Sequence, residues 1–437
     1  MSAGMATKDA IGTKHQDAGI GRGLRIVHIY DGDYPTADVR SEKVSRSLTD
    51  AGCEVHIVAR NRAWAATREQ LPEGLVHRMQ PISWLGQRLD GALGFPAFAN
   101  PRWIALLSRL VRTVHADVII ARDLPLCPTA LWVGRRLGVP VVFDMAENYP
   151  AMMRDIWNVG QQGPLDWLLR NPAIVAGVER YCLPRVDHVI TVVDESAQRV
   201  VRAGVPENRV SVVRNTPFLS RLPTLSPRDQ SPTRPLELIY LGLIEMPRGI
   251  DEVLDALAIL RRGPRAVRCT FIGAGRDEHA LRQRAVALGL EAEAKFVGFV
   301  PYREALGLVA RADVGLVPHR ATEAWNTTIP NKLFDYMGAG LPVVTSDAAP
   351  AARIVREAGA GEVFRSRDGR ELALAITRLF DRDVRVACGD AGRRAVFERY
   401  NWAHDSERLL RAVEAVVRPT RTRRFSTGPE ALALMAD

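Results

Sequence analysis

The chain has 437 residues, of which 47% are hydrophobic and 25% are charged. These values are typical of a globular protein and exclude a mostly disordered, collagen-like or disulfide-stapled chain. No apolar run reaches the roughly 20 residues of a membrane-spanning helix, so an integral membrane protein is not expected. The formal net charge of +9 favours an anionic partner, either nucleic acid, an acidic membrane face or a phosphorylated substrate.

The N-terminal stretch and the spacing of the cysteines bear on the cellular compartment of the protein. Residues 1–23 are polar and rich in glycine, without the apolar segment of a secretory signal, and we expect a disordered lead-in. The five cysteines are far apart in the sequence. This spacing favours a reducing compartment over a disulfide framework or a zinc knuckle, so a cytoplasmic location is expected.

Strand and helix patterns alternate through the first half of the chain. An apolar run at 24–30, a helical pattern with Val44 and Leu48 on one face, and a second apolar run at 54–59 form one βαβ unit. Further strands are predicted at 117–121, 139–143 and 188–193. Because these runs are continuous rather than alternating, we expect a parallel sheet covered on both faces, in an N-terminal domain over 24–215.

A proline-rich stretch at 216–235 predicts a linker, after which the α/β rhythm restarts. Strands are predicted at 236–241, 268–272, 295–297, 314–317 and 342–345, with a helix at 251–260. A second domain over 236–400, a C-terminal helix over 401–417 and a basic tail over 418–437 complete the chain. The predicted fold class is α/β, with two facing, doubly wound Rossmann-like domains.

The most informative motif is a helix start that precedes the last predicted strand. Pro330 suits a first helical turn, and Thr328 is a candidate cap. The free N–H groups there, including those of Thr328 and Ile329, would attract an anion. Lys332 adds a cation, and Asp335 could accept hydrogen bonds from paired hydroxyls such as those of a ribose. The alternative is an ordinary capped helix with a solvated lysine and aspartate.

The run Pro330-Asn-Lys-Leu-Phe-Asp-Tyr-Met337 closely resembles a signature of the retaining glycosyltransferases of family 4, which have the GT-B fold of two facing Rossmann-like domains. The resemblance extends over about 24–417 and is most specific over 238–345. Segments similar to other elements of this family lie at 187–193, 210–217, 240–251, 271–275, 296–301 and 312–318. The resemblance implies donor binding by the second domain and acceptor binding by the first.

Carried over position by position, the resemblance implies roles around the donor. Asp335 falls on the second glutamate of the family's pair, which binds the donor ribose. Thr327 falls on the first, which touches the donor sugar, so that carboxylate is missing and the Thr327 hydroxyl or Glu323 would have to substitute. Arg248 falls on the diphosphate-binding lysine and keeps its charge. Leu243 replaces a companion arginine, and Lys332 would compensate for that lost cation.

Three further donor-side candidates come from loops that follow strands. Gly273 and Gly275 resemble the family's glycine turn, and Phe299 lies in the loop that resembles its base-side loop. A Gly-x-Gly pair without a third glycine is a weak nucleotide signature. Two interpretations of the pair therefore stay open, a tight strand-to-helix turn and a close approach of the nucleotide.

The first domain offers candidates at the ends of its strands. Gly32 follows the first strand, where the family keeps a loop beside the diphosphate. Arg122 and Asp123 end another strand and would face the acceptor, or else form a local pair at the sheet edge. Ala146 stands where the family often has histidine, so Glu147 is the candidate for the missing polar contact.

The segment 82–114 mixes aromatic and apolar residues with arginines such as Arg88 and Arg109. This composition fits a membrane-surface helix, and it also fits an ordinary core helix with solvated arginines. Because acceptors of the family are often lipid-linked sugars, the segment and the arginine-rich tail suggest peripheral attachment to the inner face of the plasma membrane.

Together these features predict a glycosyltransferase that moves a sugar from a nucleoside-diphosphate sugar to a glycan or lipid-linked acceptor in polysaccharide synthesis, with retention. Arg248, Lys332 and Glu147 are the predicted catalytic residues. No cofactor or metal is expected, because the Asp-x-Asp triplets at 31–33 and 381–383 do not follow strands of the donor domain. The alternatives are a sugar-nucleotide epimerase and a nucleotide-sugar-binding pseudoenzyme. Nucleic-acid binding lacks a matching motif.

Overall fold

The computed structural model describes residues 22–426 except 36–38, 87–89, 91–92, 94–97, 99, 159–170 and 224–233, and only the backbone of 418–426. The predicted lead-in up to residue 21, most of the linker, Arg88 and the tail beyond residue 426 lie outside this part. The chain divides into two units. Unit 1 comprises the residues up to Val192, the segment Ala197–Val213 and the residues from Ser406 on. Unit 2 comprises Val193–Ser196 and Arg214–Asp405.

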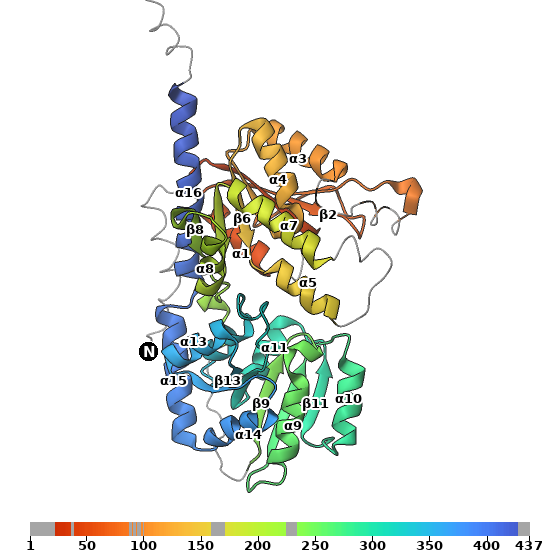
Figure 1. The fold of residues 1–437 in the computed structure, drawn as a ribbon, viewed down its shortest axis with the longest axis vertical. Helices are drawn as coiled ribbons and strands as arrows, with labels where there is room; N and C mark the ends of the chain where they lie inside the picture. Colours follow the sequence, from red (N-terminus) through yellow and green to blue (C-terminus); the bar gives the residue numbers. More distant parts are fainter. Residues whose placement is uncertain are drawn as a thin grey trace, which may run out of the picture. The chain divides into compact units, whose positions relative to one another are not determined.

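Unit 1 is built on an eight-stranded sheet in the order β3-β4-β2-β1-β5-β6-β7-β8, with only the β3–β4 pair antiparallel in the described residues (Figure 1). The strands are β1 (Arg25–Asp33), β2 (Glu54–Arg60), β3 (Arg68–Leu71), β4 (Gly74–Arg78), β5 (Val118–Arg122), β6 (Val141–Met145), β7 (His188–Thr191) and β8 (Val210–Val212). The helices are α1 (Val39–Asp50), α3 (Pro101–Thr113), α4 (Cys127–Leu137), α5 (Tyr149–Asn158), α7 (Pro172–Cys182) and α8 (Asp194–Arg202), whose first residues count with unit 2.

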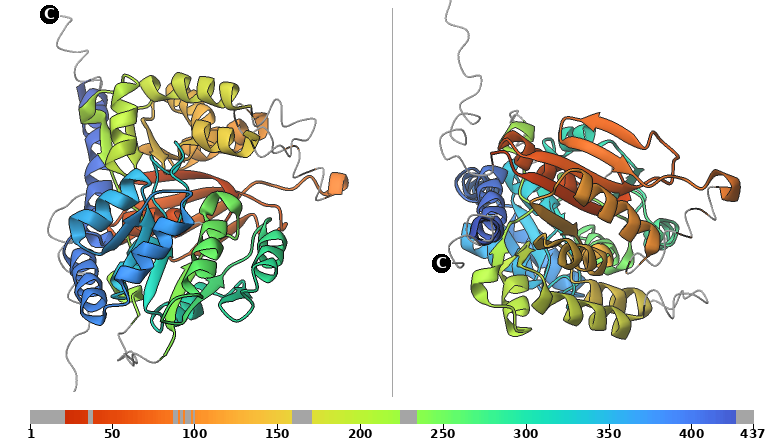
Figure 2. Two further views of the ribbon diagram at one scale, coloured as in Figure 1. Left: turned by 60° about the horizontal axis from the view of Figure 1, so that its bottom comes forward. Right: turned by 90° about the horizontal axis from the view of Figure 1, so that it is seen from above.

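Unit 2 is built on a six-stranded parallel sheet in the order β11-β10-β9-β12-β13-β14. The strands are β9 (Leu236–Leu241), β10 (Val267–Ile272), β11 (Ala294–Gly298), β12 (Val314–Val317), β13 (Val343–Ser346) and β14 (Gly361–Phe364). The helices are α9 (Ile250–Leu260), α10 (Glu278–Ala287), α11 (Tyr302–Val309), α12 (Lys332–Gly338), α13 (Ala349–Ala358), α14 (Gly369–Arg378) and α15 (Arg382–Glu398). Figure 2 shows the strands and helices of both units from further directions.

The central strands are buried because helices cover the faces of each sheet. Every residue of β5 and β6 is buried, as the continuous apolar runs predict for a central parallel strand. Helices α3 and α4 pack side by side in unit 1, and α9 and α14 do so in unit 2 (Figure 1). Each unit has its own hydrophobic core, so each sheet is stabilised within its unit.

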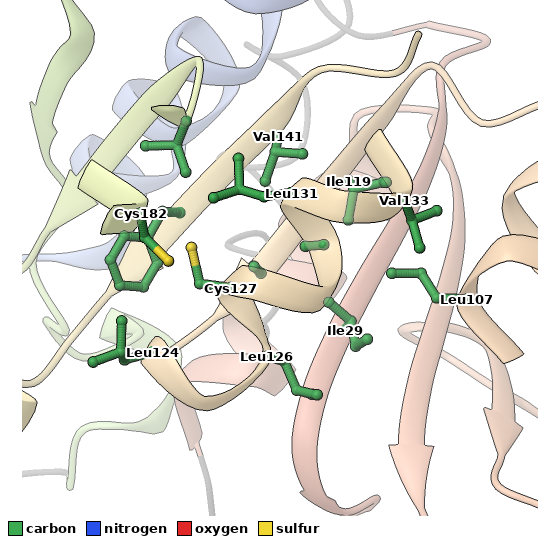
Figure 3. Close-up of a cluster of buried hydrophobic side chains, with 14 of the residues drawn as sticks. Ile29, Leu107, Ile119, Leu124, Leu126, Cys127, Leu131, Val133, Val141 and Cys182 are labelled. Carbon is green, nitrogen blue, oxygen red and sulfur yellow. The ribbon is translucent and has the colours of Figure 1, made fainter. Parts of the chain in front are cut away.

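Two cysteines that are far apart in the sequence meet in the core of unit 1. The sulfur atoms of Cys127 and Cys182 point toward each other between the helices α4 and α7 (Figure 3). Both are free thiols and fully buried. Burial raises the pKa of the Cys127 thiol well above its usual value. These thiols therefore pack as small apolar side chains.

Two elements differ from their sequence-based prediction, and a third, α3, favours one of the two interpretations left open above. Strand β1 continues to Asp33, so Gly32 lies within a strand and not in a loop after it. Helix α3 buries Trp103, Leu107 and Val111 in the core, which supports the core-helix interpretation for this part of the segment 82–114. Helix α16 (Trp402–Ser426) extends beyond the predicted end of the C-terminal helix. No described helix has both the length and the apolar character to cross a membrane.

A charged pair lies completely inside unit 1. Arg40 of α1 donates two hydrogen bonds of 3.0 Å from Nε and one of 2.6 Å from Nη2 to the carboxylate of Asp144 in β6. A further bond of 2.9 Å runs from Nη1 to the carbonyl of Val213. Although burial opposes ionisation, the Arg40 guanidinium leaves the pKa of Asp144 below its usual value. The pair is therefore charged, and it joins α1, β6 and the end of β8.

Candidate active site

Three basic side chains gather at the carboxyl ends of the strands of unit 2. Arg248 ends a short 3-10 turn after β9, His319 lies just beyond β12, and Lys332 begins α12. The central strands β9 and β12 are neighbours in the sheet, so the loops that follow them emerge at the same edge. Ligands of doubly wound sheets bind at this edge.

Arg248 is held by three side chains. Its Nη1 lies 3.4 Å from Nε2 of His319, and its guanidinium carbon lies 5.3 Å from the centre of the Trp325 ring. Its Nε lies 3.5 Å from a carboxylate oxygen of Glu245, and it has no hydrogen-bond partner among the described residues. The guanidinium is fixed in place, but one of its donors is left unused.

Lys332 has a buried amine without a hydrogen-bond partner among the described residues. Its side chain is 6% exposed, and Nζ lies 3.7 Å from the centre of the Tyr240 ring with no acceptor among the described residues. Burial, with a smaller effect of Arg248, holds the pKa of the Lys332 amine well below its usual value, and Asp335 opposes this shift. A cation–π contact compensates only part of the cost of burying an ammonium group.

His319 contributes a third unused donor or acceptor. It is 1% exposed, and Nδ1 has no partner among the described residues. Burial, followed by Lys332 and Arg248, holds the pKa of the imidazole well below its usual value. Arg248 Nε, His319 Nδ1 and Lys332 Nζ are thus buried nitrogens without a hydrogen-bond partner among the described residues, and we call the three side chains the basic cluster. Unpaired buried donors are costly, so the cluster is suited to a ligand rich in acceptors and negative charge.

A carboxylate lies beside the basic cluster, one helical turn along α12. Asp335 is buried and accepts a hydrogen bond of 2.8 Å from the hydroxyl of Tyr302 at the start of α11. Burial and the neighbouring Asp335 raise the pKa of the Tyr302 hydroxyl. The site therefore presents positive charge and a carboxylate–phenol pair next to each other.

Backbone contacts fix the two loops that carry Arg248 and His319. Gly249 has φ +72°, and a Cβ there would lie 1.9 Å from the carbonyl oxygen of Pro318. The amide of Arg320 donates to the carbonyl of Pro247 at 3.2 Å, and the Arg320 side chain forms ion pairs with Asp251 and Glu252. The loops approach so closely that only glycine fits at position 249.

The glycines of the predicted nucleotide turn are explained by another backbone contact. A Cβ at Gly273, which has φ +137°, would lie 1.9 Å from the carbonyl oxygen of Gly242. A Cβ at Gly275 would lie 2.2 Å from that of Ile244. Of the two interpretations left open above, the tight turn accounts for both glycines without a ligand.

The helix start at Pro330 is the main correction to the predicted site. Helix α12 begins at Lys332, and Asn331 stands in the cap position, where its side chain caps no helical amide but accepts a hydrogen bond of 2.8 Å from Asn215 Nδ2. Thr328 is therefore not the cap, and the amides of Thr328 and Ile329 are not those of a helix N-terminus.

The other residues predicted on the donor side either form local hydrogen bonds or are exposed to solvent. The hydroxyl of Thr327 donates to the carbonyl oxygens of Glu323 at 2.9 Å and Ala324 at 3.2 Å. Leu243 is 49% exposed and Phe299 is 79% exposed. Thr327 thus closes its own turn, whereas Leu243 and Phe299 present apolar surface to solvent.

The first-domain candidates lie in unit 1. Arg122 forms an ion pair with Asp123, the local pair weighed above, and the amide of Ala146 donates to Asp123 at 3.3 Å. Asp123 has φ +62°, a left-handed backbone that is uncommon for aspartate. Glu147 is half-buried just after β6, and Gly32 is buried within β1.

Both Asp-x-Asp triplets have structural contacts. Asp31 pairs with Arg60, and Asp33 accepts a bond of 2.7 Å from the amide of Arg62. Asp381 caps α15 by accepting from the amides of Asp383 and Val384. Within the described ranges, no group of three or more histidine, cysteine, aspartate or glutamate side chains is placed to hold a metal ion.

Sequence reasoning missed His319, Trp325, Tyr302 and Tyr240. His319 follows Pro318 directly after β12, and Tyr302 follows Pro301 at the start of α11. Their places after predicted strands could have marked both as candidates. Trp325 and Tyr240 act through ring contacts with Arg248 and Lys332, which no spacing in the sequence reveals.

Two family models match the chain. Residues 36–216 match a model described as a glycosyl transferase 4-like domain, and residues 235–382 match one described as glycosyl transferases group 1. A phosphatidyl-myo-inositol mannosyltransferase of Mycobacterium leprae is 32% identical over 181 residues, covering 41% of this chain and 46% of that protein. A glycogen synthase of Mycobacterium tuberculosis is 27% identical over 210 residues, covering 47% and 49%. The chain spans about half the length of these relatives.

Solved structures share the fold over most of the chain. Sucrose-phosphate synthase from Thermosynechococcus elongatus matches with a TM-score of 0.72 at 16% identity, covering 91% of this chain and all of that chain (100%). Anabaena HepE, solved in complex with UDP, matches with a TM-score of 0.66 at 14% identity, covering 90% and 100%. The predicted α/β fold class with two Rossmann-like units (GT-B) is confirmed.

Proposed function

Because the chain belongs to the group 1 glycosyltransferases, we propose that it transfers a sugar from a nucleoside-diphosphate sugar to a glycan or lipid-linked acceptor in polysaccharide synthesis. The observation that carries this proposal is the basic cluster, in which Arg248, His319 and Lys332 each have a buried nitrogen without a hydrogen-bond partner in the described part of the chain. A diphosphate supplies only acceptors and negative charge, and so it complements these groups. Retention of configuration rests on the resemblance to the retaining family.

In this proposal the chain's own side chains stabilise the leaving group. Arg248 and Lys332 bind the diphosphate oxygens, whose negative charge grows as the bond to the sugar breaks. Asp335, with Tyr302 beside it, accepts hydrogen bonds from the ribose hydroxyls. Unit 2 positions the donor in this way, and positioning accounts for a large part of the rate. Glu147, Arg122 and Asp123 are the candidates for acceptor contacts in unit 1.

The test begins with binding and ends with turnover. Thermal unfolding is measured with UDP, GDP and inorganic pyrophosphate, and at least one nucleotide is expected to raise the melting temperature. Release of that nucleoside diphosphate from its sugar conjugates is then measured with and without a glycan acceptor. No stabilisation by either nucleotide contradicts the proposal. Binding without release favours the pseudoenzyme alternative, and release of an epimerised nucleotide sugar without acceptor favours the epimerase.

We further propose that the protein attaches to an anionic membrane. In the segment 82–114, the described Trp84 is 83% exposed, although most apolar residues of α3 are buried. An exposed tryptophan inserts favourably at a lipid interface. We expect salt-sensitive cosedimentation with liposomes containing phosphatidylglycerol, reduced by Trp84→Ala. Equal recovery in the supernatant with and without liposomes contradicts this attachment.

A further inference from the structure

His319 contacts two neighbouring side chains, the guanidinium of Arg248 and the ring of Trp325. Its Nε2 lies 3.4 Å from Arg248 Nη1, and its ring centre lies 4.2 Å from that of Trp325 in an edge-on arrangement with an interplanar angle of 65°. Trp325 in turn lies against the Arg248 guanidinium. His319 and Trp325 therefore fix two sides of Arg248, and neither residue belongs to the motif that carried the sequence-based prediction.

The contact with Arg248 determines where the imidazole carries its proton. A guanidinium has donors but no acceptor, so His319 Nε2 must be the acceptor in this contact. A neutral imidazole that accepts through one nitrogen carries its proton on the other. Its remaining N–H is therefore at Nδ1, the buried atom with no partner among the described residues.

The charges around His319 favour the same state. Two basic side chains, Arg248 and Lys332, act on the imidazole from the loop after β9 and from α12. Among the described residues, the charged groups that act on His319 are these two basic side chains, and a doubly protonated ring would add positive charge beside them. The neutral ring avoids this repulsion and keeps one acceptor and one donor.

We propose that His319 is a positioning and binding residue of the donor site, which orients the Arg248 guanidinium through Nε2 and donates from Nδ1–H to an anionic oxygen of the diphosphate. This inference rests on the proposed function and deepens it, because it adds a neutral donor between two cations. It also assigns Trp325 the role of holding the imidazole and the guanidinium at a fixed distance.

Three substitutions separate the two contacts. His319→Gln places an amide oxygen near the position of Nε2, so the contact with Arg248 is kept while the Nδ1–H donor is lost. His319→Asn places an amide nitrogen near the position of Nδ1, so the donor is kept while the contact with Arg248 is lost. His319→Phe keeps a ring against Trp325 and removes both. His279→Phe, at an exposed histidine of α10, is the matched control.

Affinity is measured by calorimetry with inorganic pyrophosphate and with the nucleotide, UDP or GDP, that stabilises the wild-type protein. We expect about tenfold weaker binding in the Gln and Asn variants and about a hundredfold loss in the Phe variant, since each lost charge-assisted bond corresponds to about tenfold. The control is expected to bind like wild type. A Phe variant that binds within twofold of wild type overturns the proposal, as does a loss explained fully by unfolding of the free variant.

The protonation state is tested without any nucleotide. Nitrogen NMR of histidine-labelled protein is expected to show His319 as the neutral Nδ1–H tautomer from pH 6 to 8. The Nε2–H tautomer or an imidazolium overturns the proposal even if nucleotides bind. If wild-type protein binds neither nucleotides nor pyrophosphate while the tautomer is as stated, the proposed function and the Nδ1 contact fail, and the contact with Arg248 stands.

Discussion

Replacing Lys332 by methionine is expected to raise the thermal stability of the free protein and to abolish sugar transfer. Methionine has nearly the length of lysine without its amine, and the Lys332 amine is buried with no acceptor among the described residues. A buried polar group without a hydrogen-bond partner costs about 1–3 kcal/mol, so an apolar side chain of similar shape is expected to stabilise the free protein. Loss of activity together with a gain in stability is typical of a binding residue and not of a structural one.

The sign of the pH effect follows from the same contacts. Burial and Arg248 favour the neutral amine of Lys332 in the free protein, against the smaller effect of Asp335, so its pKa is low. A bound diphosphate favours the charged amine and raises that pKa. Binding therefore takes up a proton where the pH lies between the free-state pKa and the higher bound-state pKa, and the affinity falls as the pH rises through that range.

Calorimetry with pyrophosphate in buffers of different ionisation enthalpy measures this proton uptake, and differential scanning measures the stability. Lys332→Met is expected to remove the uptake and to flatten the pH dependence of binding. Lys295→Met, at an exposed lysine of β11, is the matched control and should change neither quantity. A Lys332→Met protein that melts earlier than wild type, or that keeps its turnover, contradicts this description of the site.

Breaking the buried Arg40–Asp144 pair is expected to have the largest effect on the stability of unit 1. Each side chain is 1% exposed, and the guanidinium bonds both carboxylate oxygens as well as the carbonyl of Val213. Either Arg40→Met or Asp144→Asn leaves a buried charged group without its counterpart. The expected cost is about 3–5 kcal/mol for each single variant.

Urea unfolding of the two single variants and of the double variant Arg40→Met/Asp144→Asn checks this expectation. The double variant should be less destabilised than the sum of the single variants, because no unpaired charge remains. Arg46→Met, which removes an exposed partner of Asp50 on the same helix, should cost less than about 1 kcal/mol. Additive losses, or an Arg46 effect as large as that of Arg40, would contradict the assignment.

The fold could be read from the sequence because buried parallel strands are continuous apolar runs. The runs at 117–121 and 236–241 correspond closely to β5 and β9. Strands β3 and β4 were missed, since Arg68–Leu71 is a polar, largely exposed edge strand with no such pattern. The end of β1 was placed too early because Asp31 and Asp33 look like loop residues, whereas Arg60 and the amide of Arg62 are their partners within the sheet.

Only those residues of the site that belong to recognisable local motifs could be predicted from the sequence. Arg248, Lys332 and Asp335 were found through a motif, and the structure brings them into one unit at the ends of its strands. Their electrostatic state could not be predicted, because it depends on burial and on the rings of Tyr240 and Trp325. The helix start was wrong for a related reason, since residue types alone did not show that the turn at Asn331 delays α12 to Lys332.

The central claim is that the basic cluster binds the diphosphate of the donor. Its most direct test is calorimetric titration of inorganic pyrophosphate into the wild-type, Lys332→Met and Arg248→Gln proteins at pH 7 and low salt. We predict saturable binding to wild type and at least tenfold weaker binding to each variant, since each loses a charge-assisted contact. Equal affinity in all three folded proteins would contradict the claim.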